Sequence, residues 1–347
     1  MLSPYLSHKI RCIQFILMFL IVYLHGYFPL ITPDGGEFVN SSSAFIQNII
    51  SQEIARIAVP MFFIISGFLF FYSPPKNWHD YINKWRKRFK SLLIPYLLWS
   101  VMGLFLYFIL QSIPFAKPYF LHKLIKDYSL HELMYTVLWQ PVPYQLWFIR
   151  DLMIYSLITP AIYLLSKSKL VSILCIASIW IAGANFPFIK LHFLSFYFAG
   201  CLLALYRINI ENMNYQGVAR FIGIVWLVLV TIGAIHQTIH ISDLGLIHQI
   251  TILIGIFSAW YNFDLVENVF KGSLSVMLSF SFFVFCFHEP LLTILKKASL
   301  SLAGSPEIFS LSRYLLCPFL AFWLSVLAGY VLKNKLYRAY SLLTGGR

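Results

Sequence analysis

Long apolar runs, broken by short polar segments, recur along the whole chain. The hydrocarbon core of a bilayer is about 30 Å thick, so a helix needs about 20 mostly apolar residues to cross it. Ten runs approach that length, near residues 10–30, 54–73, 91–112, 147–166, 170–188, 191–206, 218–239, 245–262, 274–295 and 312–333. The pattern predicts an all-α, polytopic membrane bundle of about ten transmembrane helices. We expect one membrane domain over residues 1–347, with no appended soluble domain.

The composition agrees with this pattern. The mean hydropathy is +0.75, 59% of the 347 residues are hydrophobic and 11% are charged, which is outside the range of soluble globular domains. The first run follows a short basic region, as in a signal peptide, but no small-residue cleavage site follows it directly, so we expect it to remain as a helix. All five cysteines lie within or at the ends of apolar runs, which indicates small core residues and not a disulfide framework.

The distribution of basic residues predicts the orientation. Lys and Arg are retained on the cytoplasmic side of membrane proteins. With the N-terminus inside, 17 of them fall in inner segments and 7 in outer segments. Both termini are therefore expected in the cytoplasm. The formal charge of +13 is explained by this topology, so nucleic acid is not expected as a partner.

Two connections between the runs have recognisable patterns. Apolar positions recur at spacings of four and three from Trp78 to Leu92, which predicts an amphipathic helix on the inner membrane surface before it turns into the third crossing. The outer connection 113–146 contains Ser129 and Glu132, a capping box for a short helix. This connection is either a lid over a substrate site or simple packing over the helix ends.

Ionisable side chains occur at a similar depth in four of the predicted crossings. His25, Arg56, Arg150 and His288 all lie toward the outer side. Such groups are costly inside a bilayer unless they pair or face water, so each is a candidate functional residue. Taken singly, a histidine is more often a packing residue, and each arginine is able to extend to the interface. Their shared depth favours one joint site.

The first helix links this depth to the cytoplasmic side. Gln14 precedes His25 by eleven residues and lies on nearly the same helical face, and Arg11 lies one turn earlier. A substrate long enough to span from Gln14 to His25 would be bound at the cytoplasmic end and would react at the histidine. In the second helix, Pro60 is expected to bend the backbone, while Ser66 and Gly67 allow a close helix contact.

An ordered set of phrases resembles the acyltransferase-3 family of integral membrane acyltransferases. The phrases are the first helix with its buried histidine, "RIAVPMFFIISGFLFF", "RFKSLLIPYLLWS", "QLWFIRDLM", "FYFAGCLLA" and "FVFCFHEPLL". The resemblance extends from about residue 9 to 335. Members of that family have about ten membrane helices and move an acyl group, commonly acetyl from acetyl-CoA, to hydroxyls of extracytoplasmic glycans.

The resemblance implies roles for particular residues. The family's essential first-helix histidine matches His25, and its two arginines match Arg56 and Arg150. The basic position eleven residues before the histidine is Gln14 here, so Arg11 takes its place or this branch works without it. We expect a bacterial inner-membrane enzyme in which Arg86, Lys87 and Arg88, with Arg11 and Gln14, face the acyl-CoA donor. Positive-inside topology and anionic lipid explain the same basic cluster.

The predicted reaction is O-acyl transfer, with acetyl as the expected group and succinyl left open. His25 is the candidate base, or carries the acyl group itself. Arg56 and Arg150 would stabilise the oxyanion or an acidic glycan, and His288 is a second polar contact or a packing partner. No spacing suggests a metal site. Two rivals are a proton-coupled transporter or flippase of a glycan lipid, and a membrane sensor without turnover.

Overall fold

The structure is a computed structural model in which the chain forms two compact units. It describes residues 2–28, 42–114, 120, 123–182, 185–186, 189–211, 216–239, 245–270, 274–303 and 307–346. Unit 1 comprises Met1–Phe62 and Ile208–Ala328, and unit 2 comprises Phe63–Arg207 and Gly329–Arg347. The helices α3 and α15 each begin in unit 1 and end in unit 2. One membrane domain over 1–347 stays a prediction.

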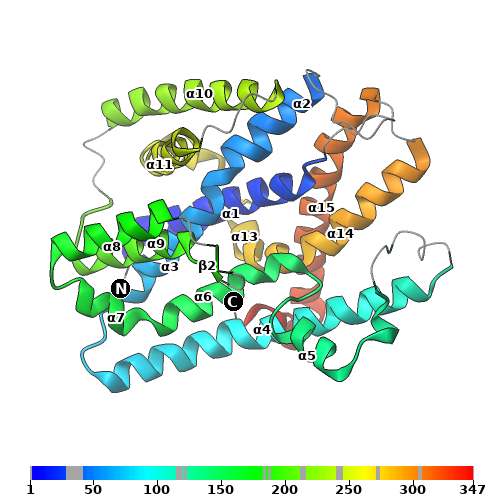
Figure 1. The fold of residues 1–347 in the computed structure, drawn as a ribbon, viewed down its shortest axis with the longest axis horizontal. Helices are drawn as coiled ribbons and strands as arrows, with labels where there is room; N and C mark the ends of the chain where they lie inside the picture. Colours follow the sequence, from blue (N-terminus) through cyan, green and yellow to red (C-terminus); the bar gives the residue numbers. More distant parts are fainter. Residues whose placement is uncertain are drawn as a thin grey trace. The chain divides into compact units, whose positions relative to one another are not determined.

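Unit 1 contains the N-terminal helices and most of the C-terminal third of the chain (Figure 1). Its elements are α1 (Pro4–Gly26), α2 (Ser42–Gln47), η1 (Asn48–Glu53), η2 (Ile54–Ile57), the start of α3 (Ala58–Phe71), α10 (Gln216–Thr238), α11 (Leu246–Tyr261), α12 (Asp264–Glu267), η6 (Asn268–Phe270), α13 (Leu274–Met277), η7 (Leu278–Phe280), α14 (Ser281–Ala303) and most of α15 (Glu307–Lys335).

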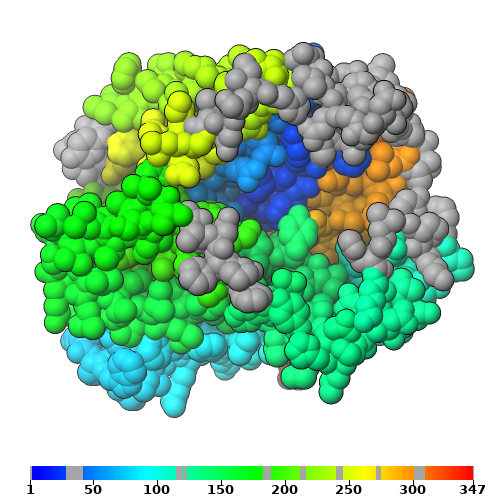
Figure 2. All heavy atoms as spheres, in the orientation of Figure 1, coloured from blue at the N-terminus to red at the C-terminus, as the bar shows by residue number. Residues whose placement is uncertain are grey.

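The first helix, α1, is held in unit 1 by aromatic and close backbone contacts. The Phe15 ring meets Phe322 of α15 edge to face, with centroids 5.2 Å apart. A Cβ added at Gly26 would lie 2.4 Å from Cγ of Pro318, so α1 ends with its backbone against α15. Figure 2 shows the atoms of α1 (dark blue) recessed between those of α11 (yellow) and α14 (orange). The C-terminal end of α1 is therefore enclosed by several elements of the same unit.

The segment leading into α3 is irregular. Asn48–Glu53 forms a π-helix and Ile54–Ile57 a 3-10 helix, two forms that are uncommon inside a span and recur at functional sites. Pro60 has no N–H to donate to the carbonyl of Arg56, four residues earlier. The sequence predicted a bend caused by Pro60, and the break lies directly before it, at the helical turns that Pro60 leaves unsupported.

Unit 2 contains the middle of the chain and the C-terminal helix (Figure 1). Its elements are the rest of α3, α4 (Trp78–Ser112), η4 (Ile125–Asp127), α5 (Leu130–Leu138), η5 (Tyr144–Leu146), α6 (Trp147–Leu157), α7 (Thr159–Leu165), α8 (Lys169–Ala182), the antiparallel pair β1 (Asn185–Phe186) and β2 (Ile189–Lys190), α9 (His192–Leu205), the end of α15 and α16 (Tyr337–Thr344).

The amphipathic segment from Trp78 is the first part of α4, which runs unbroken to Ser112. The prediction that it turns before the third crossing is therefore wrong, although Pro95 lies inside the helix. Two cations of this segment bond backbone carbonyls of α3: Lys84 Nζ donates to that of Phe70 (2.6 Å) and Arg88 to that of Ser66 (2.9 Å). Phe70 is in the last turn, where carbonyls have no partner within the helix and carry partial negative charge, so Lys84 caps α3. Arg88 binds one turn earlier and joins α4 to the helix body.

The contact between α3 and α9 is made by glycine, as the sequence predicted for Gly67. A Cβ at Gly67 would lie 2.1 Å from the carbonyl oxygen of Tyr197, and one at Gly200 would lie 2.0 Å from that of Ile64. The two backbones thus touch where only glycine fits.

The outer connection contains the predicted short helix, α5. Ser129 Oγ accepts from the N–H of Glu132, and the Glu132 carboxylate accepts from the N–H of Ser129, which confirms the capping box. On α4, Tyr96 donates to the carbonyl of Leu138 and Ser100 to that of Val137. In unit 2, α5 is therefore packed against α4.

Six helices in the described part of the chain are long and apolar enough to cross a membrane, or up to eight if two bent pairs each count as one span. The bent pairs are 144–165 and 246–270, each broken at 54°. The apolar helices α8 and α9 are shorter, with 14 residues each. All ten predicted runs therefore correspond to helices, whereas ten complete crossings and cytoplasmic termini stay predictions.

Candidate active site

The two predicted histidines meet in unit 1. Nδ1 of His25, in the last turn of α1, lies 3.0 Å from Nε2 of His288, in the second turn of α14. The ring planes differ by 17° and the ring centroids are 5.2 Å apart, so the nearly parallel rings meet at their edges. His288 is completely buried and His25 partly buried. Residues 263 positions apart in the sequence are thus joined by one hydrogen bond.

The surroundings of His288 assign the proton positions in this pair. Nδ1 of His288 lies 2.8 Å from the carbonyl oxygen of Val284. A carbonyl only accepts, so Nδ1 carries the proton and donates. Complete burial disfavours a charged imidazolium, which leaves Nε2 of His288 as an acceptor. Nδ1–H of His25 therefore donates to His288, and Nε2 of His25 carries the lone pair.

Side chains from three other elements of unit 1 hold the end of α1. Ser51 of η1 donates to the carbonyl of Tyr23 (2.7 Å) and bonds the hydroxyl of Tyr314 (2.8 Å). Gln47 of α2 accepts from the N–H of Phe28 (2.9 Å). Lys296 of α14 donates to the carbonyls of His25 (3.3 Å) and Tyr27 (3.1 Å). The backbone on both sides of His25 is thereby fixed.

Sequence reasoning missed these supporting residues. The signal available was the density of polar residues in "SSSAFIQNIISQE", which lies among apolar runs. Ser43, Gln47 and Ser51 of that phrase are buried, and Ser43 and Gln47 both bond the hydroxyl of Ser310. Lys296 follows His288 by eight residues on the same helix, which the sequence alone did not mark as important.

Arg56, the third predicted residue, lies in η2 of unit 1. Its side chain is exposed and donates to the side-chain oxygen of Gln52. Glu53, three residues before Arg56, has other partners: it accepts from Gln237 (2.8 Å) and lies 3.3 Å from Nδ1 of His248. The irregular turns η1 and η2 therefore direct Glu53 toward α10 and α11, while the bond to Gln52 is made by Nη2 of the Arg56 guanidinium.

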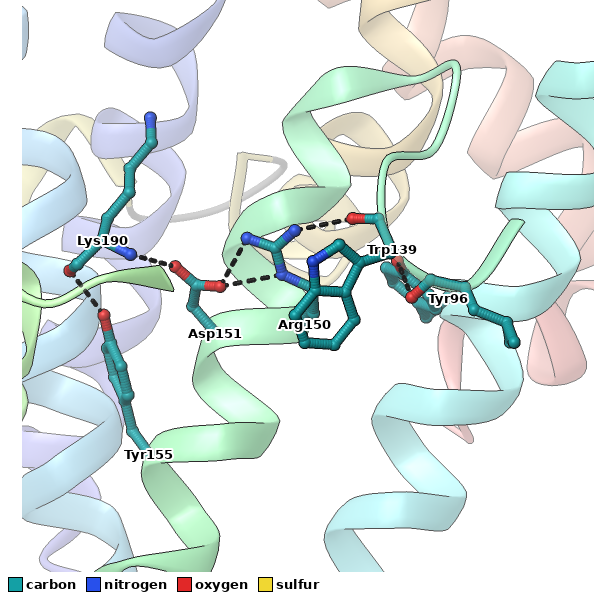
Figure 3. A network of polar contacts seen from close by, with 7 residues as sticks. Tyr96, Trp139, Arg150, Asp151, Tyr155 and Lys190 are labelled. Carbon is teal, nitrogen blue, oxygen red and sulfur yellow. Dashed lines mark hydrogen bonds and ion pairs between the residues drawn. The ribbon is translucent and has the colours of Figure 1, made fainter. Parts of the chain in front are cut away.

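Arg150, the fourth, belongs to a buried network in unit 2 (Figure 3). Its Nε and Nη2 donate to Oδ1 of Asp151 (3.0 and 2.8 Å), and its Nη1 donates to the carbonyl of Trp139 (2.6 Å). Oδ2 of Asp151 accepts from the N–H of Lys190 (3.1 Å), and Tyr155 donates to the carbonyl of Lys190 (2.7 Å). Arg150 thus joins α6 to the segment after α5, and its partner Asp151 joins α6 to β2.

The predicted donor-binding residues lie in two places. In unit 1, Arg11 is exposed on α1 and bonds the carbonyl of Ser7 (3.4 Å), while Gln14 is partly buried. Met18 and Ile21, which continue that face toward His25, are buried, so the face is covered by protein between Gln14 and His25. In unit 2, Arg86 and Lys87 are exposed on α4, and Arg88 is engaged with Ser66.

The described residues show no arrangement that favours metal binding. Within the described ranges, no three His, Cys, Asp or Glu side chains gather as a metal-ion site would require. The imidazole pair has only two nitrogen atoms facing each other, and they share a proton.

Comparison with known proteins decides the family. The model of the acyltransferase-3 family, described as an acyltransferase domain, matches residues 7–332. The chain belongs to the acyltransferase-3 family. With six to eight candidate spans, this acyltransferase is a multi-pass integral membrane protein. It is also 25% identical over 295 residues to the succinoglycan biosynthesis protein ExoH of Rhizobium meliloti (strain 1021), covering 83% of this chain and 79% of that protein. No solved structure matches the acyltransferase.

Proposed function

We propose that this acyltransferase moves an acyl group, acetyl in the first instance, from cytoplasmic acyl-CoA to a hydroxyl of an extracytoplasmic glycan. Family membership supports an acyl donor and an acyl acceptor. The relative named for succinoglycan biosynthesis favours a polysaccharide or its lipid-linked precursor as the acceptor. The observation that carries the proposal is the bond between His25 and His288, because it orients one imidazole as a base.

In the proposed reaction, Nε2 of His25 accepts the proton of the glycan hydroxyl while the hydroxyl oxygen attacks the thioester carbonyl. The carbon–sulfur bond breaks, and the CoA thiolate leaves with the proton from the His25 imidazolium. During the transfer, His288 accepts from Nδ1–H of His25 and keeps the ring in one orientation. In a second route, Nε2 attacks the thioester first and CoA leaves as the thiolate. The hydroxyl oxygen then attacks the acyl carbon, the bond from that carbon to Nε2 breaks, and the hydroxyl proton neutralises the CoA thiolate.

The other predicted residues receive proposed roles that follow their contacts. The exposed guanidinium of Arg56 is the better placed to donate to an oxyanion or to an acidic sugar. Arg150, whose Nε, Nη1 and Nη2 all bind protein acceptors, is proposed to position the segments around it. The exposed Arg86 and Lys87 are proposed to meet the phosphates of acyl-CoA, with Arg88, Arg11 and Gln14 as further donor-side contacts.

The proposal includes an orientation in the bacterial cytoplasmic membrane. The excess of basic residues on inner segments, 17 against 7, supports cytoplasmic termini. His25 then lies about 30 Å from the N-terminal end of α1, which begins at Pro4, and is placed toward the outer leaflet. The thioester has to reach it from the cytoplasm and the glycan from the opposite side, with the lipid bilayer as the common partner.

The test measures CoA release by purified protein in lipid nanodiscs. Acetyl-CoA and succinyl-CoA are supplied separately with a lipid-linked glycan or a purified polysaccharide, and released thiol is followed with a thiol reagent. We expect acceptor-dependent release that His25→Ala reduces by about 10²–10⁴-fold, the usual contribution of a general base. The matched control is His79→Ala, because His79 is an exposed histidine of α4 that bonds Asn83 of the same helix.

The outcomes separate the proposal from its rivals. Normal turnover by folded His25→Ala protein would refute the role of His25. A proton-coupled transporter or flippase would move the glycan lipid without consuming thioester, and a sensor would not bind acyl-CoA. Loss of O-acyl groups from the surface polysaccharide after deletion of the gene would support the enzyme, and reappearance of the same groups with a His25→Ala copy would contradict it.

A further inference from the structure

The carbonyl groups at the outer end of α1 are satisfied by a cation from another helix. The last carbonyls of a helix find no donor within it, and α1 ends at Gly26. Nζ of Lys296 lies 3.3 Å from the carbonyl oxygen of His25 and 3.1 Å from that of Tyr27. It also stands over the ring of Phe28, 5.3 Å from the centroid. The partly buried ammonium of Lys296 is thus a cap for the turn that carries His25.

This cap comes from the helix that carries the partner imidazole. His288 and Lys296 are eight residues apart on α14, about 12 Å along its axis, and both bond the last turn of α1. One contact joins the two imidazoles and the other joins the ammonium to the backbone carbonyls. Ser51 and Gln47 also hold this end of α1. The two contacts from α14 lie at different heights, so they set the rotation and the axial position of α1 against the helix that carries His288.

We propose that Lys296 is a positioning residue for the acyl transfer, a proposal that rests on the proposed function of His25. It holds the carbonyls of residues 25 and 27 so that Nδ1–H of His25 stays directed at His288, and Nε2 stays directed at the reacting hydroxyl. Lys296 touches the backbone and takes no part in bond making. Its effect on the reaction passes through the orientation of His25.

Lys296→Met is the decisive variant, because it keeps most of the volume and removes the donors. A displacement of about 1 Å at a reacting group costs up to about 10²-fold in rate, so we expect kcat to fall about 10–100-fold while KM for acyl-CoA changes less than about 2-fold. Lys296→Arg retains a donating cation and is expected to stay within about 3-fold of wild type. Lys297→Met, the same change one position along α14, is the matched control and should leave kcat unaltered.

A second readout does not depend on activity. In protein labelled with ¹⁵N-histidine, the proton shared by His25 and His288 gives a low-field ¹H signal, assigned by its loss in His25→Ala and in His288→Ala. We expect this signal to be lost in Lys296→Met and retained in Lys296→Arg and Lys297→Met. If Lys296→Met does not fold, Lys296→Gln, which keeps one N–H donor but no charge, is judged by the same two readouts and is expected to lie between Met and Arg.

The kcat values and the low-field signal together distinguish failure of the Lys296 role from failure of the proposed function. An unaltered low-field signal together with unaltered kcat in folded Lys296→Met overturns the positioning role and leaves the proposed function standing. Absence of thioester turnover in wild type, with the signal still dependent on Lys296, overturns the proposed function alone. A rise in KM with kcat unaltered would place Lys296 in donor binding and overturn the inference.

Discussion

Two buried polar pairs, one in each unit, show how differently rare polar residues are used at membrane depth. In unit 2, Arg150 and Asp151 neutralise each other through Nε, Nη2 and Oδ1, and their other polar atoms, Nη1 of Arg150 and Oδ2 of Asp151, are bonded to backbone groups. In unit 1, His25 and His288 form a directional chain that starts at the Val284 carbonyl and ends at Nε2 of His25. The first pair is closed, meaning that its charges are paired and its polar atoms are bonded to protein partners, and it suits a structural role. The second delivers a lone pair to one defined atom and suits proton transfer.

The comparison has a general lesson for reading such sequences. Rarity of a charged or titratable residue inside apolar runs marks all four positions equally. What separates them is the number of donors and acceptors already used by protein partners. Arg150 and Asp151 are adjacent in the sequence and neutralise each other's charge. His25 and His288 are 263 positions apart and pair only when the chain has folded.

The largest effect on stability is expected from breaking the closed pair. Arg150→Ala leaves Asp151, which is completely buried, without its counter-ion, and such a change costs about 3–5 kcal/mol. The double variant Arg150→Met with Asp151→Leu removes both charges and should recover most of that loss. Thermal unfolding of the purified protein in detergent checks both. Equal destabilisation by the single and double variants would show that the pair is not closed as described.

The imidazole pair should respond in activity more than in stability. His288→Phe removes the acceptor for Nδ1–H of His25, and we expect kcat to fall about 10–100-fold, since an unoriented base is a poorer catalyst. His288→Gln restores an acceptor near the former Nε2 and should lie between Phe and wild type. The unfolding temperature of each variant is the control. A large stability loss with unaltered kcat would make this pair resemble the one in unit 2.

A smaller effect is expected where a cation bonds a backbone carbonyl of a neighbouring helix. Arg88 donates to the carbonyl of Ser66, so Arg88→Ala should lower stability by about 1.5–3 kcal/mol, the range for hydrogen bonds to charged groups. Lys87→Ala, next to it and exposed, should change stability by less than about 0.5 kcal/mol. Thermal unfolding of the two variants side by side measures the difference. Equal effects would indicate that the basic segment acts only through its overall charge.

The smallest effect concerns α5, outside the predicted spans. Hydrogen bonds from Lys123 and then from Ser129 lower the pKa of Glu132 from 4.5 to about 2. A carboxylate with a lowered pKa in the folded state stabilises the fold fully above pH 4.5, and the contribution is lost as the pH falls through about 2. Deuterium uptake of α5, corrected for intrinsic exchange, should therefore rise as the pH falls over that range.

A variant separates this capping effect from general acid sensitivity. Glu132→Gln removes the charge that Lys123 contacts, so uptake in α5 should already be raised at neutral pH and should depend less on pH. Asp127→Asn, an exposed acid in the same connection, is the matched control. Similar profiles for Glu132→Gln and wild type would contradict the assigned role of the carboxylate.

The parts of the fold that depend on local pattern were predictable from the sequence. Helices occupy all ten apolar runs, Ser129 caps α5, and Gly67 marks a close contact between helices. Each of these follows from neighbouring residues: hydropathy over about 20 positions, a cap three residues from its partner, or the absence of a side chain.

Other features depend on contacts that no short stretch encodes. Whether the segment from Trp78 lies on the surface or continues as α4 depends on its packing, including the bond from Trp85 to the carbonyl of Ser156. The partners of Glu53 come from residues more than 180 positions away. Lys296 was read only as an outer positive charge, because its two carbonyl partners lie more than 260 positions away.

The π-helical segment Asn48–Glu53 determines the direction around the helix axis in which the later side chains of the second span point. A turn of this kind holds one residue more than an α-turn, so it acts as a built-in insertion. Deleting a single residue there would let the segment close into regular α-helix and would rotate Arg56 by about 100° about the axis. The guanidinium would then point to another side of the helix, and the register of Pro60 and Gly67 would be lost in the same step.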